Sequence, residues 1–376
     1  MRVLLVHDEP EFFAGAEKML TYFLAGLQSG GCQVAVACVR ASRLDAAMPQ
    51  EVQRIWVRND RHFSVFGLGR EVNAILAARR EFPFDVAHSW AARGWEVAAL
   101  AGRLSRRPSV GTLHDHPRAK FLSANRRRLM RWSVRLGIQR VACVSEAVRH
   151  ACLEAGYPAR KLLVIHNGVP AMAPATRLTR TDQLRLGFLG VISARKGLGD
   201  LFCILDELYK LTPAAWSLEI AGGAQDREGE DYMNKLRQRF SGRAWWPRVR
   251  WRGWVEQPID FLRSLDLMVC PSSEFDPFPT VLLEAGRAEV AVLAADIGGV
   301  REIVEDGRTG WVYQPGDYIQ AAKCIAKLLA EPGLAEAAGA SGARRISSTF
   351  SMDAMVDKYL ALYASVVGVG IDRSTP

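Results

Sequence analysis

The stretch Pro271–Gly286, PSSEFDPFPTVLLEAG, organises the expected fold of this chain. It follows the apolar run Leu267–Cys270, which is short enough to be a buried strand, and it leads into Thr280–Arg287, which has the composition of a helix start. Pro277 and Pro279 fix φ and remove two N–H donors, so the chain turns between the strand and the helix. The free N–H groups of such a helix start form an anion site, which predicts that a phosphate group binds there.

Two carboxylates flank this turn. Asp276 and Glu284 stand eight positions apart, one before the turn and one in the first turns of the helix, so both can face a ligand that lies across the helix start. This spacing predicts a nucleotide sugar held through its hydroxyl groups. The alternative is a surface turn with two solvated carboxylates, because that is the ordinary state of Asp and Glu.

The segment from Asp276 to Glu284 resembles the signature of the family 4 glycosyltransferases, retaining enzymes of the GT-B fold: an acid, seven residues and a Glu. The resemblance implies that Asp276 contacts the hexose of the donor and that Glu284 holds the ribose. It also implies that the amides of Thr280 and Val281 hold the diphosphate, and we include Phe278 among the donor-binding residues. Asp276 stands where the family more often has Glu, which bears on the identity of the donor sugar.

Length and composition predict an ordinary globular protein of two domains. At 376 residues the chain exceeds what one hydrophobic core usually serves, and 49% of its residues are hydrophobic and 24% charged. It has no apolar run of about eighteen residues, and its N-terminal apolar stretch is too short for a signal peptide, so we expect a cytoplasmic protein. The seven cysteines show no C-x-x-C spacing and no cluster with His, which predicts reduced core residues rather than disulfides or a zinc site.

Short apolar runs alternate with helix-length segments in the first half of the chain. The expected strands are 2–7, 34–39, 54–57, 85–88 and 109–113, and the expected helices are 14–28, 68–80 and 95–103; further along, 141–145 and 147–153 resemble a strand and the helix that follows it, and 162–165 come next. This alternation predicts a parallel sheet covered on both faces, with ligands beyond the carboxyl ends of the strands. The first turn lacks G-x-G-x-x-G, which disfavours a nicotinamide enzyme. By the family resemblance Gly15 of this turn approaches the donor; the alternative is a glycine that only eases the helix start.

His114 follows the expected strand at 109–113, at the sheet edge where ligands bind. Imidazole titrates near neutral pH and can donate to or accept from a sugar hydroxyl. By the family resemblance His114 faces the donor sugar, where we expect it to orient the substrate rather than to remove a proton. The alternative is a histidine bonded only to its own loop, and His88 is a weaker candidate. No further ligands at suitable spacing accompany His114, so no metal site is expected.

The net charge of +9 is concentrated in one part of the chain. Residues 101–150 hold 12 Lys and Arg against two acidic residues, whereas the remainder has 37 basic and 38 acidic residues. Within this block, residues 117–140 are expected to form a basic helix with apolar residues and a Trp among the arginines. Such a helix can bind an anionic membrane through residues 118–135, in particular through Arg126, Arg127, Arg128 and Arg131. A solvated helix face with snorkelling arginines is the alternative, and nucleic acid is disfavoured because no nucleic-acid-binding motif accompanies the charge.

A second alternating pattern begins after a Pro-, Ala- and Thr-rich linker at 170–183. It starts with 184–189 and a helix at 198–211 and continues with 218–223, 249–255 and the expected strand 267–270, and the segment 290–295 adds to the family resemblance. By the family resemblance Lys196 grips the donor diphosphate, and Gly253 and Trp254 lie by the base. Val191 stands where the family usually has Arg, and Arg195 can compensate for it.

The resemblance covers nearly the whole chain and implies the GT-B fold, two Rossmann-like doubly wound parallel-sheet domains facing across a cleft. We expect an acceptor domain at 1–170, a donor domain at 183–350, and a helix at 351–368 that crosses back to the first domain. No internal repeat or low-complexity tract interrupts this division.

The implied activity is that of a retaining, hexosyltransferase-like enzyme that needs neither a metal nor a cofactor. It would move a sugar from a nucleotide sugar, a UDP- or GDP-sugar, to a hydroxyl of a glycan or lipid-linked acceptor in cell-surface glycan synthesis. The expected catalytic residues are His114, Lys196 and Asp276. The alternatives are a non-catalytic sugar-binding or membrane-surface scaffold and a GT-B-type sugar-nucleotide epimerase.

Overall fold

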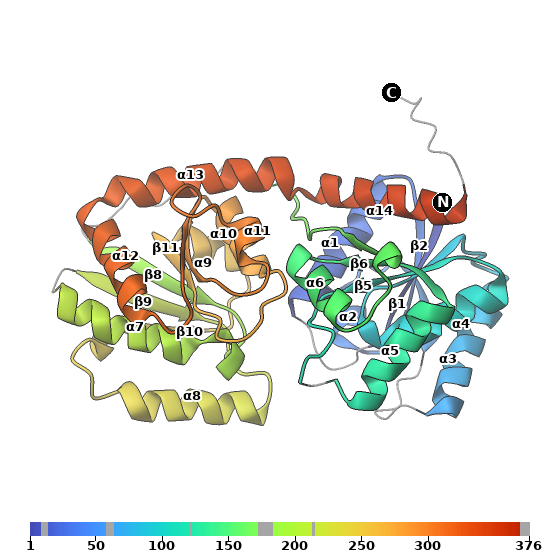
Figure 1. Ribbon diagram of the computed structural model, residues 1–376, viewed down its shortest axis with the longest axis horizontal. Coiled ribbons are helices and arrows are strands. Elements are labelled where there is room, and N and C mark those ends of the chain that lie inside the picture. The colour runs from blue at the N-terminus through green and yellow to red at the C-terminus, as the bar shows by residue number, and fades with distance from the viewer. Residues whose placement is uncertain (9–13, 58–63, 121, 172–182, 213–214, 369–376) are drawn as a thin grey trace. The chain divides into compact units, whose positions relative to one another are not determined.

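The computed structural model describes residues 1–8, 14–57, 64–120, 122–171, 183–212 and 215–368. Its contacts divide the chain into two compact units. The N-terminal unit holds the chain up to Pro170 together with the segment that begins at Met352, and the C-terminal unit runs from Ala171 to Ser351. Each unit is built around one parallel sheet with helices on its faces (Figure 1).

The N-terminal sheet has seven strands in the order β3-β2-β1-β4-β5-β6-β7, and all its pairings are parallel. The strands are β1 (Arg2–His7), β2 (Gln33–Val39), β3 (Gln53–Val57), β4 (Val86–Ser89), β5 (Ser109–Leu113), β6 (Ile138–Cys143) and β7 (Leu162–Val164). The interior of β1 is buried on both faces, as expected for a covered parallel sheet. The strand order reverses between β1 and β4, so the loops after these strands diverge at the carboxyl edge of the sheet.

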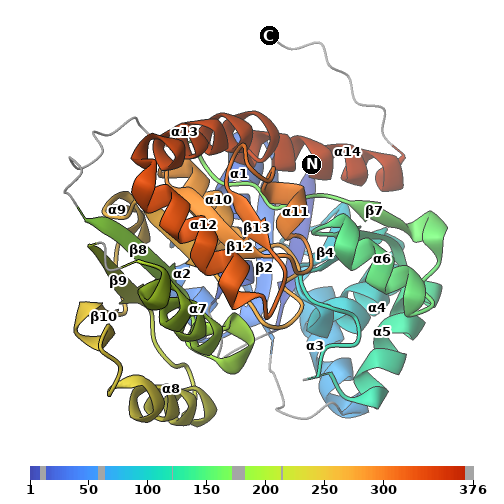
Figure 2. The same ribbon diagram turned by 60° about the vertical axis from the view of Figure 1, so that its left-hand side comes forward.

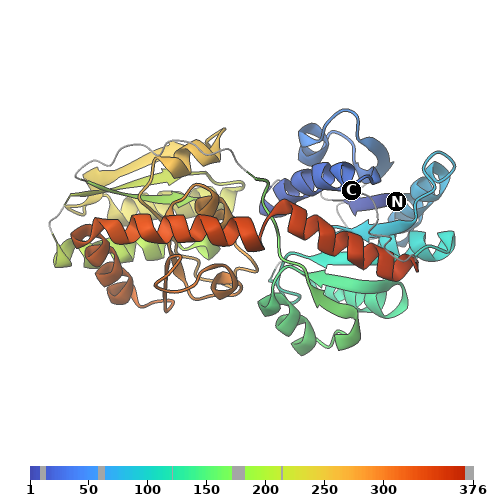
Figure 3. The same cartoon turned by 90° about the horizontal axis from the view of Figure 1, so that it is seen from above.

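Helices cover this sheet, and the last helix of the chain packs along the first (Figure 3). They are α1 (Gly15–Ser29), α2 (Arg43–Ala47), α3 (Val65–Ala78), α4 (Trp95–Ser105), α5 (Ala124–Leu136), α6 (Glu146–Glu154) and α14 (Met352–Val367), with the 3-10 helices η1 (Ala92–Gly94) and η2 (Ala159–Lys161). Gly26 of α1 allows α14 to come close, because a Cβ there would lie 2.6 Å from the side chain of Val356.

A buried polar network joins α14 to the sheet. Nδ1 of His88 lies 2.6 Å from the hydroxyl of Tyr363, and its Nε2 lies 2.8 Å from Oγ1 of Thr112. The same Thr112 oxygen lies 2.8 Å from the hydroxyl of Tyr359. Burial, with His114 nearby, lowers the pKa of His88 to about 3, so its ring is neutral. Both ring nitrogens are occupied, which leaves neither for a ligand.

Replacing Tyr363 by Phe is expected to destabilise the protein. The change leaves a fully buried His88 nitrogen without its partner, which costs about 1–3 kcal/mol. Thermal unfolding should show Tm lower by several degrees, at roughly 2–4 °C for each kcal/mol in a domain of this size. Tyr209→Phe is the matched control, because Tyr209 is 40% exposed and should leave Tm unchanged. Equal Tm values for the two variants would contradict a stabilising role for the network.

The C-terminal sheet has six parallel strands in the order β10-β9-β8-β11-β12-β13. They are β8 (Leu184–Leu189), β9 (Trp216–Ala221), β10 (Val249–Gly253), β11 (Leu267–Cys270), β12 (Ala291–Ala295) and β13 (Trp311–Tyr313). The helices are α7 (Leu198–Leu211), α8 (Arg227–Phe240), α9 (Pro258–Arg263), α10 (Thr280–Arg287), α11 (Val300–Ile303), α12 (Tyr318–Ala330) and α13 (Pro332–Thr349), with η3 (Ala194–Lys196) and η4 (Trp246–Arg248). Helices α7 and α12 pack side by side (Figure 2), while α10 packs against α9 and α13.

The two doubly wound parallel sheets confirm the predicted fold class. The predicted bounds of β8, β11, α7 and α10 agree with the structure residue for residue. Helices α8, α12 and α13 were not predicted, and most of the expected linker at 170–183 lies outside the described residues. All seven cysteines are free, and five of them are buried, in agreement with the prediction.

The prediction of one basic helix over 117–140 is wrong at both ends. Helix α5 begins only at Ala124, because Oγ of Ser123 accepts the N–H of Arg126 at 3.2 Å and caps it. It ends before Gly137, and the next residues already belong to β6. Residues 117–123 therefore precede the helix. Among the described residues, no helix combines the length and the apolar character needed to cross a membrane.

Candidate functional site

In the C-terminal sheet the strand order reverses between the neighbouring strands β8 and β11. The loops that follow these strands diverge at the carboxyl edge, which is where open α/β sheets bind ligands. Gly197, in the first loop, has a φ of +70°, and a Cβ there would lie 1.8 Å from the carbonyl oxygen of Pro271 in the second loop. Only glycine therefore lets the two loops come this close.

Lys196 and Asp276 form an ion pair between these loops. Nζ of Lys196 lies 2.7 Å from Oδ2 of Asp276, and the hydroxyl of Ser272 donates to the same oxygen at 2.9 Å. Asp276 is only 3% exposed, and burial raises its pKa, but the charge and the hydrogen bond of Lys196 outweigh burial and lower the pKa below its ordinary value. Asp276 is thus ionised at neutral pH, and its carboxylate holds the half-buried Lys196 side chain at the sheet edge.

Helix α10 starts directly after this pair. Its N-cap, Pro279, offers no side-chain cap, and the first two helical residues, Thr280 and Val281, are half-buried. The first turn of a helix carries partial positive charge, which favours an anion. Glu284, 8% exposed, lies about one turn further along. Phe278 is buried, and its ring packs edge-on against Phe350 with the centroids 5.6 Å apart, so it supports the loop rather than lining an open surface.

The predicted donor residues Arg195, Gly253 and Trp254 occupy the neighbouring loops of the same edge. Gly253, with a φ of +65°, ends β10, and its carbonyl accepts the N–H of Gly222 at 2.7 Å. Trp254 is 61% exposed. The side chain of Arg195 is exposed, while its carbonyl accepts the N–H of Ser273 at 3.0 Å. The guanidinium of Arg195 is therefore available beside Lys196, and the half-buried Val191 carries no charge.

His114 lies at the carboxyl edge of the N-terminal sheet, directly after β5. Its ring packs against Trp90 with the centroids 4.8 Å apart. Burial lowers the pKa of His114 to about 4, so the ring is neutral at physiological pH. Its Nε2 is buried and has no hydrogen-bond partner among the residues that the structure describes. A buried nitrogen of this kind costs free energy unless a ligand or water satisfies it, which is compatible with a role in binding.

The sequence did not point to three residues near His114, which are His7, Glu17 and Trp90. Nε2 of His7, at the end of β1, donates to Oε1 of Glu17 at 3.1 Å, and the other oxygen of Glu17 accepts the N–H of Ala14 at 2.8 Å. Trp90 donates from its indole to the carbonyl of Ala16 at 2.8 Å. The start of α1, where Gly15 is the first residue, is therefore hydrogen-bonded to Trp90, the residue whose ring packs on His114. The signal was the pattern G-A-E at an expected helix start, in which the Glu side chain can accept the N–H of the N-cap residue.

Helix α5 exposes a basic face with apolar residues in it. The residues of this face recur at helical spacing, and all of them are exposed, Trp132 by 48% and Leu136 by 52%. We call them the α5 face: Arg128, Arg131, Trp132, Arg135 and Leu136. Arg126 points elsewhere, because its guanidinium forms an ion pair with the buried Glu96. The expectation that Arg126 contributes to the membrane-binding surface is therefore corrected.

The two sets of residues lie in different units. The C-terminal set offers an ammonium group, a helix N-terminus and two carboxylates, which together can hold a phosphate and sugar hydroxyls. The N-terminal set offers the neutral imidazole of His114. In the described part of the chain no three His, Cys, Asp or Glu side chains are grouped to hold a metal ion.

Family models match both units. The model "Glycosyltransferase Family 4" matches residues 13–171, and "Glycosyl transferases group 1" matches residues 174–345. The alpha-maltose-1-phosphate synthase of Mycolicibacterium smegmatis is 27% identical over 97% of this chain and 100% of its own length. A lipopolysaccharide core biosynthesis glycosyltransferase of Rhizobium meliloti, LpsE, is 25% identical over 93% of this chain and 96% of its own length.

Solved structures share the fold. The crystal structure of Anabaena HepE in complex with UDP-glucose has a TM-score of 0.82 and 22% identity, and the match covers 97% of this chain and 100% of that one. Because the two family models together span nearly the whole chain and full-length relatives carry glycosyltransferase names, the chain belongs to the family 4 glycosyltransferases and has their GT-B fold.

Proposed function

We propose that this glycosyltransferase moves a sugar from a nucleotide sugar to an acceptor hydroxyl with retention of configuration. The observation that carries the donor assignment is the Lys196–Asp276 ion pair beside the start of α10, at the point where the strand order of the C-terminal sheet reverses. An ammonium group and free helix amides together suit a diphosphate, and carboxylates suit the hydroxyls of a sugar.

Each residue then has a role. Lys196, helped by the amides of Thr280 and Val281, stabilises the negative charge that grows on the leaving diphosphate, a task that fixed positive groups in a dry site perform well. Asp276 holds a hexose hydroxyl, and Glu284 holds the ribose. His114 is proposed to orient a substrate; with its low pKa it is a hydrogen-bonding group rather than an acid. No metal ion or cofactor is part of this proposal, since Lys196 supplies the positive charge.

The names of the relatives help to choose the donor and the acceptor to test first. HepE was crystallised with UDP-glucose, and LpsE is named for lipopolysaccharide core biosynthesis. These names support a UDP-hexose as the first donor to test, ahead of a GDP-sugar, and a cell-surface glycan or its lipid-linked precursor as the acceptor. The α5 face supports the lipid-linked form, because arginines interleaved with Trp and Leu bind anionic bilayers. The protein then acts at the membrane surface on the side where nucleotide sugars are made.

A donor panel tests this function. We expect the wild-type protein to turn over one UDP- or GDP-sugar, with slow hydrolysis when no acceptor is present. Glu284→Gln should weaken binding of the corresponding nucleoside diphosphate about tenfold or more, because a charged hydrogen bond to the ribose is lost. A rise in Tm with nucleotide but no turnover of any sugar would instead favour the non-catalytic scaffold.

A further inference from the structure

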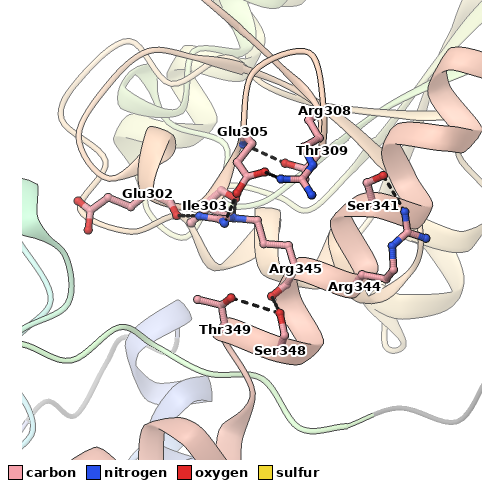
Figure 4. Close-up of polar contacts among 10 residues, drawn as sticks. All are labelled: Glu302, Ile303, Glu305, Arg308, Thr309, Ser341, Arg344, Arg345, Ser348 and Thr349. Carbon is pink, nitrogen blue, oxygen red and sulfur yellow. Dashed lines mark hydrogen bonds and ion pairs between the residues drawn. The ribbon is translucent and has the colours of Figure 1, made fainter.

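Arg345 of α13 holds the carboxyl end of the short helix α11 (Figure 4). Its Nε donates to the carbonyl oxygen of Ile303 at 2.8 Å, and its Nη2 donates to the carbonyl oxygen of Glu302 at 2.8 Å. Its Nη1 forms an ion pair with Glu305. The guanidinium thus satisfies two carbonyl groups at a helix end and neutralises a carboxylate, a combination that its planar fork of donors makes possible.

The other end of α11 touches the backbone of Asp276. The N–H of Gly299, the N-cap of α11, donates to the carbonyl oxygen of Asp276 at 3.0 Å. Gly298 has a φ of +62°, and a Cβ there would lie 1.9 Å from the same oxygen, so no larger residue fits. Helix α11 therefore links Arg345 to the backbone of the residue that pairs with Lys196.

A second contact runs from Arg345 to the same loop through aromatic rings. The guanidinium carbon of Arg345 lies 5.5 Å from the centroid of the Phe350 ring, within cation–π range. Phe350 in turn packs edge-on against Phe278, two residues beyond Asp276. Arg345 thus supports both sides of the turn between Asp276 and α10.

We infer that Arg345 is a positioning residue for sugar transfer, which holds Asp276 in the place where its carboxylate meets Lys196 and the donor hexose. Its part is to act through α11 and Phe350 rather than on the reacting atoms. This inference rests on the proposed function, because it assigns Asp276 to the hexose. It goes beyond that function by placing a determinant of the donor site on α13, 69 positions further along the chain.

The nucleotide part of the site has separate support. Helix α10, which carries Glu284, packs on α13 through Gly286, where a Cβ would lie 2.5 Å from the side chain of Ile346. That contact does not involve the guanidinium of Arg345. Loss of Arg345 should therefore disturb the position of Asp276 more than that of Glu284, so transfer should suffer while nucleotide binding persists.

The test compares Arg345→Gln with Arg344→Gln. Arg344 is the adjacent residue on α13, is exposed, and donates to Ser341 at 2.9 Å (Figure 4), so its change removes the same guanidinium away from the loop. For Arg345→Gln we expect kcat to fall about tenfold or more, because charged hydrogen bonds that fix Asp276 are lost, while the Kd for UDP or GDP changes by less than about threefold. Arg344→Gln should match the wild type in both. Arg345→Lys, which keeps the charge but not the fork, should recover part of kcat.

Two results would overturn the inference. Equal kcat values for Arg345→Gln and Arg344→Gln would overturn it. A parallel loss of kcat and nucleotide affinity would also overturn it, since Arg345 would then support the whole unit. If Arg345→Gln does not fold, Phe350→Leu keeps the question open to test, because it removes only the aromatic contact and should still lower kcat ahead of nucleotide affinity. Absence of turnover by the wild type on every donor would refute the proposed function instead.

Discussion

Replacing Lys196 by Ala is expected to lower the rate of sugar transfer by about one to two orders of magnitude, because a charged hydrogen bond worth roughly 1.5–3 kcal/mol disappears where negative charge grows. The loss should appear in kcat and kcat/KM together if the contact forms mainly in the transition state. Lys210→Ala is the matched control. Lys210 also pairs with a carboxylate, Glu207 at 2.6 Å, but at an exposed position of α7, so its loss should leave the rate unchanged.

The same variant should also destabilise the protein, and pH separates this effect from catalysis. Asp276 would be left buried and charged without its main partner, which raises its pKa. In the wild type the pKa of Asp276 is lowered on folding, so its contribution to stability is present above the unfolded pKa and is lost as the pH falls through the folded pKa. The difference in stability between wild type and Lys196→Ala should therefore be largest near neutral pH and shrink in acid.

A double variant, Lys196→Ala with Asp276→Asn, removes the buried charge as well. We expect it to regain much of the stability lost by Lys196→Ala but none of the transfer activity. Measurements of Tm and of the initial rate on the active donor check both statements. Near-normal turnover of Lys196→Ala on its true substrates would refute the assignment of Lys196 to the diphosphate.

The strands of both sheets could be predicted from the sequence because the local composition of each segment agrees with the element that it forms in the fold. Strand β11 is a short apolar run, and the prolines and the Gly of the next segment mark a turn and a helix, so the bounds of β11 and α10 follow from composition alone. Helix α13 was not predicted because its apolar periodicity is weak. Gly, Ala and Ser make up much of the helix, and it packs on α10 through small residues such as Gly342 of α13 and Gly286 of α10. Close backbone packing of this kind leaves no apolar periodicity in the sequence.

The site was predictable where residues near in sequence act together, and not where distant segments meet. The spacing from Asp276 to Glu284 is local, but the ion pair with Lys196 spans 80 positions and depends on two neighbouring strands. The orientation of Arg126 could not be predicted either, because its partner Glu96 lies on another helix, 30 positions away. Helical spacing alone places Arg126 among the other arginines of the basic segment.

The inward position of Arg126 changes the design of a membrane experiment. A variant that includes Arg126 would break its ion pair with the buried Glu96 and would damage the fold. The suitable change is Arg128→Gln with Arg131→Gln and Arg135→Gln, because all three side chains are exposed on the α5 face. A control of equal charge, chosen from exposed positions of the C-terminal unit, is Arg227→Gln with Lys235→Gln and Lys323→Gln.

Wild-type protein is expected to float with vesicles of anionic lipid at low salt and to be released at high salt, since exposed charges are screened beyond about 8 Å at physiological ionic strength. Each Arg near an anionic surface adds about 1 kcal/mol, so the triple α5 variant should bind roughly a hundredfold more weakly, whereas the control variant should float like the wild type. Activity on a membrane-presented acceptor should fall with binding, while donor hydrolysis in solution should not. Trp132→Ala should weaken flotation even at low salt, because it removes apolar rather than electrostatic attraction. If wild-type protein never floats with anionic vesicles, the arginines of the α5 face are only solvated, and the acceptor is a soluble glycan.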